Sequence, residues 1–173
     1  MAEQDPGGDD RAPMHVRLLH SPDEWRLARE ARLAALRSEP DWLLPGRPHE
    51  SSWTEERWRR SWDNGLWAVA RAGGRTIGLA RIARENETPH VESVWTHPEH
   101  RRRGVASALV RELITMERKR GAGDVFVWVI LPNPAALRLY ASLNFETTRE
   151  QQSVDGLGRV EERWRLSGAL PED

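Results

Sequence analysis

HVESVWTHPEHRRRGVASA, residues 90–108, joins a strand to a helix through a short basic loop. The valines and the tryptophan of its first half favour a strand, which Pro98 ends because proline cannot donate a hydrogen bond to a sheet. From Leu109 to Ile114, apolar residues recur at helical spacing. The start of a helix offers unpaired N–H groups and the positive end of a dipole, and Gly104 and Ala106 leave them accessible. The stretch therefore predicts an anion site, such as a phosphate site.

The loop differs from the two commonest phosphate loops, the P-loop and the dinucleotide-binding glycine pattern. It resembles the pyrophosphate loop of the GNAT superfamily of CoA-dependent N-acyltransferases, whose pattern Gln/Arg-x-x-Gly-x-Gly/Ala is matched by Arg101, Gly104 and Ala106. The preceding residues 94–99 resemble the fourth strand of that family and its exit.

A second stretch, Asn133 to Phe145, resembles the second signature of the same family. It follows an apolar strand at residues 127–129 and ends in Leu-Asn-Phe, where the family usually has Leu-Gly-Phe. Asn144 is a mild departure, because asparagine tolerates the left-handed conformation of a helix C-cap. Two signatures in this order extend the resemblance over residues 66–150.

The 173 residues predict one domain with a hydrophobic core of its own. Charge is balanced, with 26 basic and 27 acidic residues, so composition indicates neither nucleic acid nor membrane as a partner. No apolar run is as long as a membrane span and no signal peptide is evident, so we expect a soluble, cytoplasmic protein. The absence of cysteine excludes disulfides, thiolate metal sites and a cysteine acyl-enzyme.

Two local features invite other interpretations. The arginines at 101–103 are too few for a nucleic-acid patch in an otherwise neutral chain, and phosphate neutralisation explains them better. His97-Pro98-Glu99-His100 lacks the spacing of a metal motif and has no evident third ligand, so we expect no metal. Dimers are common in the family, so the resemblance leaves a homodimer open.

Residues 1–13 form a polar tail that we expect to be disordered, residues 14–167 form the N-acetyltransferase domain, and 168–173 a C-terminal tail. Periodicity and turn residues predict strands at 14–19, 66–71, 75–83, 90–96, 124–131, 145–149 and 160–166, and helices at 21–37, 54–62, 105–120 and 133–143. Turns are expected at 63–65, 72–74, 85–88 and around Asp155-Gly156.

This order predicts a single-domain α/β fold with a mixed, mostly antiparallel sheet and helices on both faces. The resemblance implies that its parallel strand pair splays apart and that the pantetheine arm of acetyl-CoA lies in the gap. It also implies a set of cofactor-binding residues: Val94, Trp95, Thr96, Arg101, Arg102, Arg103, Gly104, Val105, Ala106, Ser107, Asn133, Ala136 and Tyr140. Within this set, the Val94 N–H is the expected partner of the thioester oxygen.

Strand alternation predicts that His90, Glu92, Val94 and Thr96 share one face. Glu92 or His90 would then receive the proton of the attacking amine, directly or through a water. Glu92 is equally explained as a solvated strand residue or an ion-pair partner, and bulk water is a third possible proton acceptor.

Tyr140 is the one tyrosine of the chain. It occupies the place of the tyrosine in the family's second signature, which implies that it protonates the leaving thiolate. The competing interpretation is a half-buried aromatic on an amphipathic helix. Asn133 is expected to cap its helix, to touch the pantetheine amide, or to do both.

The nine tryptophans are unusual. Those at 95, 128 and 164 are expected in the core, and Trp58 and Trp62, four residues apart, are expected to seat the second helix on the sheet. Trp42 and Trp53 lie in the segment that commonly roofs the acceptor site of the superfamily, beside Pro45, Gly46 and Pro48. They could bind an apolar, aromatic or cationic acceptor.

The sequence thus predicts an acetyl-CoA-dependent N-acetyltransferase that acts on a primary amine of a small molecule or peptide by direct attack. One alternative is a protein N-terminal or lysine acetyltransferase, for which the dense Trp/Pro segment looks too closed. Another is a non-catalytic acyl-CoA-binding module, against which Tyr140 counts.

Overall fold

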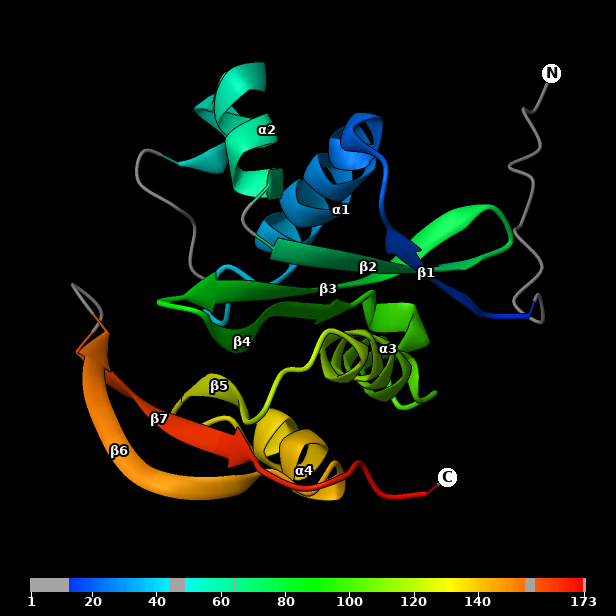
Figure 1. The fold of residues 1–173 in the computed structure, drawn as a ribbon. Helices are drawn as coiled ribbons and strands as arrows, with labels where there is room; N and C mark the ends of the chain where they lie inside the picture. Colours follow the sequence, from blue (N-terminus) through cyan, green and yellow to red (C-terminus); the bar gives the residue numbers. More distant parts are fainter. Residues whose placement is uncertain (1–12, 44–48, 64, 155–157, 173) are drawn as a thin grey trace, which may run out of the picture.

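A computed structural model describes residues 13–43, 49–63, 65–154 and 158–172, and these residues form one sheet with helices on both faces (Figure 1). The strands are β1 (His15–Leu19), β2 (Gly65–Ala72), β3 (Arg75–Glu85), β4 (Thr88–Thr96), β5 (Val125–Ile130), β6 (Glu146–Val154) and β7 (Arg159–Leu166). Their order in the sheet is β1-β2-β3-β4-β5-β7-β6, with β4 and β5 parallel and the other neighbours antiparallel. The predicted mixed sheet is confirmed, and β6 runs further than predicted. The tail at 1–12, the loop at 44–48 and the turn residues Asn64 and Asp155-Gly156 lie outside the described residues.

Four α-helices are present in the described chain: α1 (Trp25–Ser38), α2 (Glu55–Asp63), α3 (Val105–Lys119) and α4 (Pro134–Ser142). The helix predicted from Ser21 begins with a single 3-10 turn, Pro22–Glu24, closed by a capping box of Ser21 and Glu24. Two further 3-10 turns, Glu50–Ser52 and Pro98–His100, lie between the longer elements.

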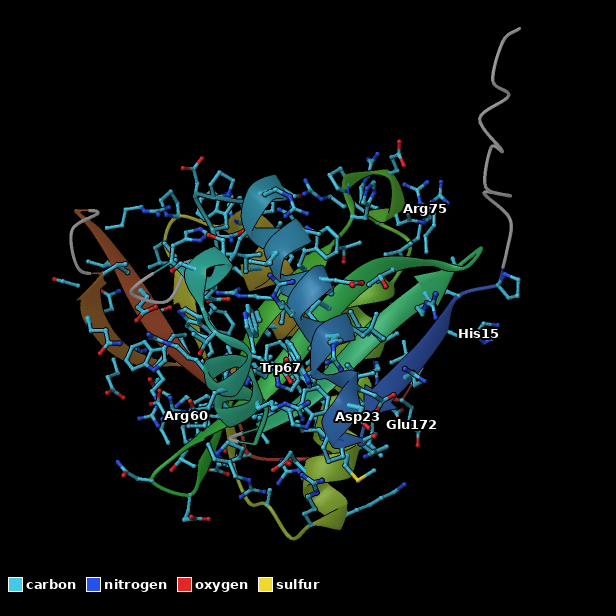
Figure 2. All side chains as sticks on the ribbon, turned by 90° about the horizontal axis from the view of Figure 1, so that it is seen from above. His15, Asp23, Arg60, Trp67, Arg75 and Glu172 are labelled. Atoms are coloured by element: carbon cyan, nitrogen blue, oxygen red, sulfur yellow. The ribbon has the colours of Figure 1, made fainter. Side chains whose placement is uncertain are left out.

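The two faces of the sheet carry separate hydrophobic cores. One face packs against α3 and α4, where Gly78 lets α3 approach the sheet because a Cβ there would lie 2.7 Å from Val105. The other face packs against α1 and α2. Figure 2 views the molecule from this second side and shows the labelled Trp67 in the area between the two helices. The buried Trp62 of α2 stacks on Trp67 of β2, with 6.4 Å between the ring centres. The prediction that tryptophan seats α2 on the sheet is therefore confirmed.

The parallel strands β4 and β5 pair over a short distance. In the described chain their register comprises His90↔Phe126 and Val91↔Val127. Beyond these pairs β4 continues on β3 and β5 continues on β7, so their carboxyl halves lie at a gap in the sheet. The splayed pair implied by the resemblance is therefore present.

A β-bulge divides β4 into two halves. Glu92 pairs with Arg81 and Trp95 with Leu79, so the register on β3 shifts by one residue between them, at the position where Ser93 has φ 57°. The prediction that the side chains of 90, 92, 94 and 96 share one face is therefore wrong. His90 and Glu92 face the α1/α2 side, whereas Val94 packs with the core of the α3/α4 side.

Candidate active site

A cavity of about 1030 Å³ occupies the gap between β4 and β5. Its walls come from both strands, from the loop and first turn of α3, from α4, and from the segment after α1. Most of the predicted cofactor-binding residues line it: Val94, Trp95, Thr96, Arg101, Arg102, Gly104, Val105, Ala106, Ser107, Asn133, Ala136 and Tyr140. Arg103 is exposed and is not part of this lining.

The start of α3 is open toward the cavity. Gly104 occupies the N-cap in the left-handed region, at φ 78°, and among the described residues no side chain caps the helix. The first turn of α3 also contains no acidic residue. By contrast, α4 is capped by Asn133, whose Oδ1 accepts a hydrogen bond from the Ala136 N–H at 3.1 Å. The first N–H groups of α3 are thus left without a side-chain cap in the described structure, which is compatible with the predicted anion site.

Arg101, which the resemblance assigns to cofactor binding, contacts protein groups in this structure. Its guanidinium forms an ion pair with Glu39, just after α1, and its Nε donates to the Thr96 carbonyl at 3.4 Å. The Trp95 indole donates to the Ser38 hydroxyl at 3.1 Å, beside the same contact. The C-terminal end of α1 is therefore tied to both β4 and the basic loop.

Tyr140 lies on α4 with its side chain 4% exposed and its ring 5.4 Å from that of Phe145. It nonetheless lines the cavity. Burial raises the pKa of the Tyr140 hydroxyl well above its ordinary value. The hydroxyl therefore keeps its proton through the neutral and mildly alkaline range, as a general acid requires.

Glu92 lines the cavity and also forms an ion pair, with the Arg81 Nη1 at 2.8 Å from its Oε1. Arg81 additionally donates to the Ser61 carbonyl at the end of α2, and burial lowers the pKa of its guanidinium. The Glu92 side chain remains 41% exposed. The two predicted interpretations of Glu92, proton acceptor and ion-pair partner, are thus compatible in this geometry.

His90 is buried, and both of its ring nitrogens have neighbours. Nδ1 lies 3.2 Å from the Thr88 carbonyl, which can only accept, so this contact requires Nδ1 to carry a proton. Nε2 lies 3.5 Å from the Arg163 guanidinium, which can only donate. Arg163 itself stacks on Phe126 at 4.0 Å and pairs with Glu150 at 3.0 Å. Both ring nitrogens therefore already face protein groups, which weakens the case for His90 as the base.

The site also contains residues that the sequence did not single out. Arg32 and Glu50 form a buried two-point ion pair, at 2.9 and 3.0 Å, on the wall formed by α1 and the segment after it. Glu161 and Gln152 contribute from β7 and β6. The positions of Glu161 and Gln152 depend on the pairing of β5, β6 and β7, and no local sequence motif surrounds these two residues.

Two tryptophans also line the cavity. Trp128 is half-buried at the cavity wall rather than in the core, so that prediction is wrong. Trp42 is exposed beside the cavity, with the Arg159 guanidinium 5.5 Å from its ring centre.

A model of the acetyltransferase (GNAT) family matches residues 30–145. The chain belongs to the GNAT acetyltransferase family. It is 36% identical over 104 residues to the N-alpha-acetyltransferase RimI of Mycobacterium tuberculosis, an alignment that covers 58% of each chain. The alignments to the curated relatives span from 40% to 58% of those relatives' own lengths.

Solved GNAT structures share the fold. The ribosomal-protein-S18-alanine N-acetyltransferase of Escherichia coli superposes with a TM-score of 0.66 at 17% identity, covering 93% of this chain and 97% of that one. The PaiA N-acetyltransferase of Thermoplasma acidophilum, in complex with coenzyme A, superposes with a TM-score of 0.59 at 17% identity, covering 87% and 98%.

The cavity of this GNAT chain suits acetyl-CoA as a substrate. An uncapped helix start preceded by arginines fits a pyrophosphate, and the unpaired edge of β4 fits the amide groups of a pantetheine arm. No described group of three or more His, Asp or Glu side chains is arranged to hold a metal ion. No described helix is long and apolar enough to cross a membrane.

Proposed function

We propose that this chain is an N-acetyltransferase that transfers the acetyl group of acetyl-CoA to a primary amine of a small molecule or peptide. The observation that carries the proposal is a single cavity that brings together the open start of α3, the freed edge of β4 and the Tyr140 side chain. These are the anion site, the binding edge and the acid that acyl transfer from a thioester needs.

In the proposed reaction the amine nitrogen attacks the thioester carbon. The N–H of Val94 accommodates the negative charge that develops on the carbonyl oxygen. The carbon–sulfur bond then breaks, and the Tyr140 hydroxyl gives its proton to the thiolate. The attacking amine is neutral, and the proton that its nitrogen loses passes to Glu92, directly or through a water. The proton given by Tyr140 leaves with the CoA thiol, and release of the Glu92 proton to solvent, with uptake of one proton by the Tyr140 oxygen, restores the resting state. Because the chain has no cysteine, transfer is direct rather than through a cysteine acyl-enzyme.

A second candidate acceptor is the N-terminus of a protein. The similarity to an N-alpha-acetyltransferase favours it. The buried Arg32–Glu50 pair and the tryptophans at the cavity wall favour a small acceptor instead, because charged and aromatic groups there can contact it directly.

Release of CoA from acetyl-CoA, followed with a thiol reagent across amines, polyamines, aminoglycosides and short peptides, tests the proposal. The protein has no thiol of its own to react in this assay. We expect release with one class of amine. Binding of acetyl-CoA without release with any acceptor would favour a binding module, and absence of binding would refute the assignment of the α3 start.

A further inference from the structure

Charge is unevenly distributed along the cavity, and each part also contains one residue of the opposite sign, Glu39 paired with Arg101 and Arg32 paired with Glu50. Arginines line the part formed by the basic loop and α4, at positions 101, 102 and 138. Carboxylates line the part formed by β3, β4, β7 and the 3-10 turn before α2, at Glu85, Glu92, Glu161 and Glu50. The first part suits phosphates, and the second suits a cationic acceptor.

The carboxylates of the acidic part have different partners. Glu50 is paired with Arg32 and Glu92 with Arg81, and Glu85 is exposed at the end of β3. Glu161 instead accepts a hydrogen bond from the neutral side-chain amide of Gln152, at 2.6 Å, and no described arginine or lysine forms an ion pair with it. Within the described residues, Glu161 thus has a neutral hydrogen-bond partner and no direct ion pair.

The arginines closest to Glu161 in sequence are engaged elsewhere. Arg159 and Arg163 share its face of β7 by alternation. Arg159 lies over the Trp42 ring, and Arg163 lies over Phe126 and pairs with Glu150. Glu161 thus faces the cavity between two cations that are both held by other groups.

The strand registers place Glu161 across the gap from Val94, the proposed partner of the thioester oxygen. Glu161 pairs with Ile130, three residues beyond the last β4–β5 pair at Val127, and Val94 lies three residues beyond Val91. Both therefore lie roughly 10 Å past the point where the strands part, and β5 and the gap separate their backbones by roughly 10 Å or more. A flexible molecule with amines at both ends spans this separation.

We propose that Glu161 binds a second positive group of the acceptor, so that the preferred substrate is a linear diamine or polyamine. Glu161 is then a specificity-determining residue: one amine attacks the thioester while the other pairs with its carboxylate, next to the Trp128 wall. This inference rests on the proposed acetyltransferase function.

Acceptors of equal length and different charge test it. With hexamethylenediamine the native protein should show a KM roughly 10- to 100-fold lower than with hexylamine or aminocaproate, the range expected for a hydrogen bond between charged groups. Glu161→Gln should remove this preference by raising the KM for hexamethylenediamine to about that for hexylamine. The matched control is Glu162→Gln, which removes the same charge from the opposite face of β7, where Glu162 accepts from the Trp164 indole; it should keep the preference.

Failure of this inference is distinguishable from failure of the proposed function. Calorimetric titration of hexamethylenediamine into the CoA-bound protein measures acceptor binding without turnover, and Glu161→Gln should weaken it by the same factor. Turnover with equal KM for the diamine and hexylamine, or a diamine affinity unchanged in Glu161→Gln, would overturn the role of Glu161. So would a preference for alanyl-alanine amide, a peptide acceptor without a second cation, over the diamine.

Discussion

The two ends of the cavity are built by different means. The cofactor end is made largely of backbone: the open N–H groups after Gly104 and the unpaired edge of β4. The acceptor end is made of side chains from four separate elements, including Glu92 and Glu161. A backbone site needs a local conformation, whereas a side-chain site needs distant elements to be brought into register. Changes at one end should therefore alter one substrate and spare the other.

The largest effect should come from Tyr140, the proposed acid, which lines the cavity from α4. Tyr140→Phe should lower kcat by about 10²- to 10³-fold, within the usual range for a general acid, while acetyl-CoA affinity stays within about twofold. Because burial raises the pKa of Tyr140, the native kcat should show no loss from its ionisation up to about pH 10, the ordinary tyrosine value. Steady-state kinetics and calorimetry measure both. An unchanged kcat would assign the tyrosine to packing alone.

Closing the start of α3 should affect the cofactor end alone. In Gly104→Asp, a carboxylate at the N-cap competes with the pyrophosphate and repels it, so we expect the KM for acetyl-CoA to rise about 100-fold with little change in acceptor KM. Gly104→Asn is the control, since asparagine has the same shape, tolerates positive φ and lacks the charge. Equal losses in both variants would show that capping of the N–H groups by the new side chain, rather than its charge, is responsible.

At the acceptor end, Glu92→Gln tests the proton acceptor. Glutamine can still accept from Arg81 through its side-chain oxygen, so the fold should be retained while kcat at neutral pH falls by about 10- to 100-fold. The pH–rate profile should lose its acidic limb. A profile and rate like those of the native protein would assign proton removal to bulk water and leave Glu92 as the partner of Arg81.

His90 should matter least. Because its Nε2 faces the Arg163 guanidinium, we expect His90→Asn to reduce kcat by less than about threefold, with its main cost in stability, about 1–3 kcal/mol for a disturbed buried hydrogen-bond partner. Thermal unfolding and the pH–rate profile distinguish these outcomes. A shift of the acidic limb in His90→Asn would transfer the role of base to this residue.

Most of the fold and of the cofactor end could be predicted from the sequence, because their signals are local. The strand before Pro98, the glycine at 104 and the asparagine cap at 133 each act on their own neighbours, and each is found as expected. Asn144 likewise adopts the left-handed conformation that a helix end requires, at φ 64°.

The acceptor end could not be predicted in the same way. Simple alternation along β4 misplaced Glu92 because the bulge at Ser93 arises from pairing with β3, which lies earlier in the chain. Glu161 reaches the cavity only because β7 inserts between β5 and β6. Trp128 resembles a core residue in sequence. It alternates along β5 with the core residues Val127 and Val129, however, so it lies on the other face of the sheet, beside Arg163.

The bulge in β4 also bears on how such a protein can diversify. The extra residue at Ser93 interrupts the register on β3: the side chains of 90 and 92 before it face the α1/α2 side, and Val94 after it faces the α3/α4 side. Substitutions at 90 and 92 can then accumulate without disturbing the backbone of 94–96. Deleting the one residue at 93 would give a regular strand in which 92 and 94 still alternate, so 90 and 92 would keep their face and only the local bend would be lost. The bulge is therefore a position at which this strand can gain or lose one residue without exchanging its two faces.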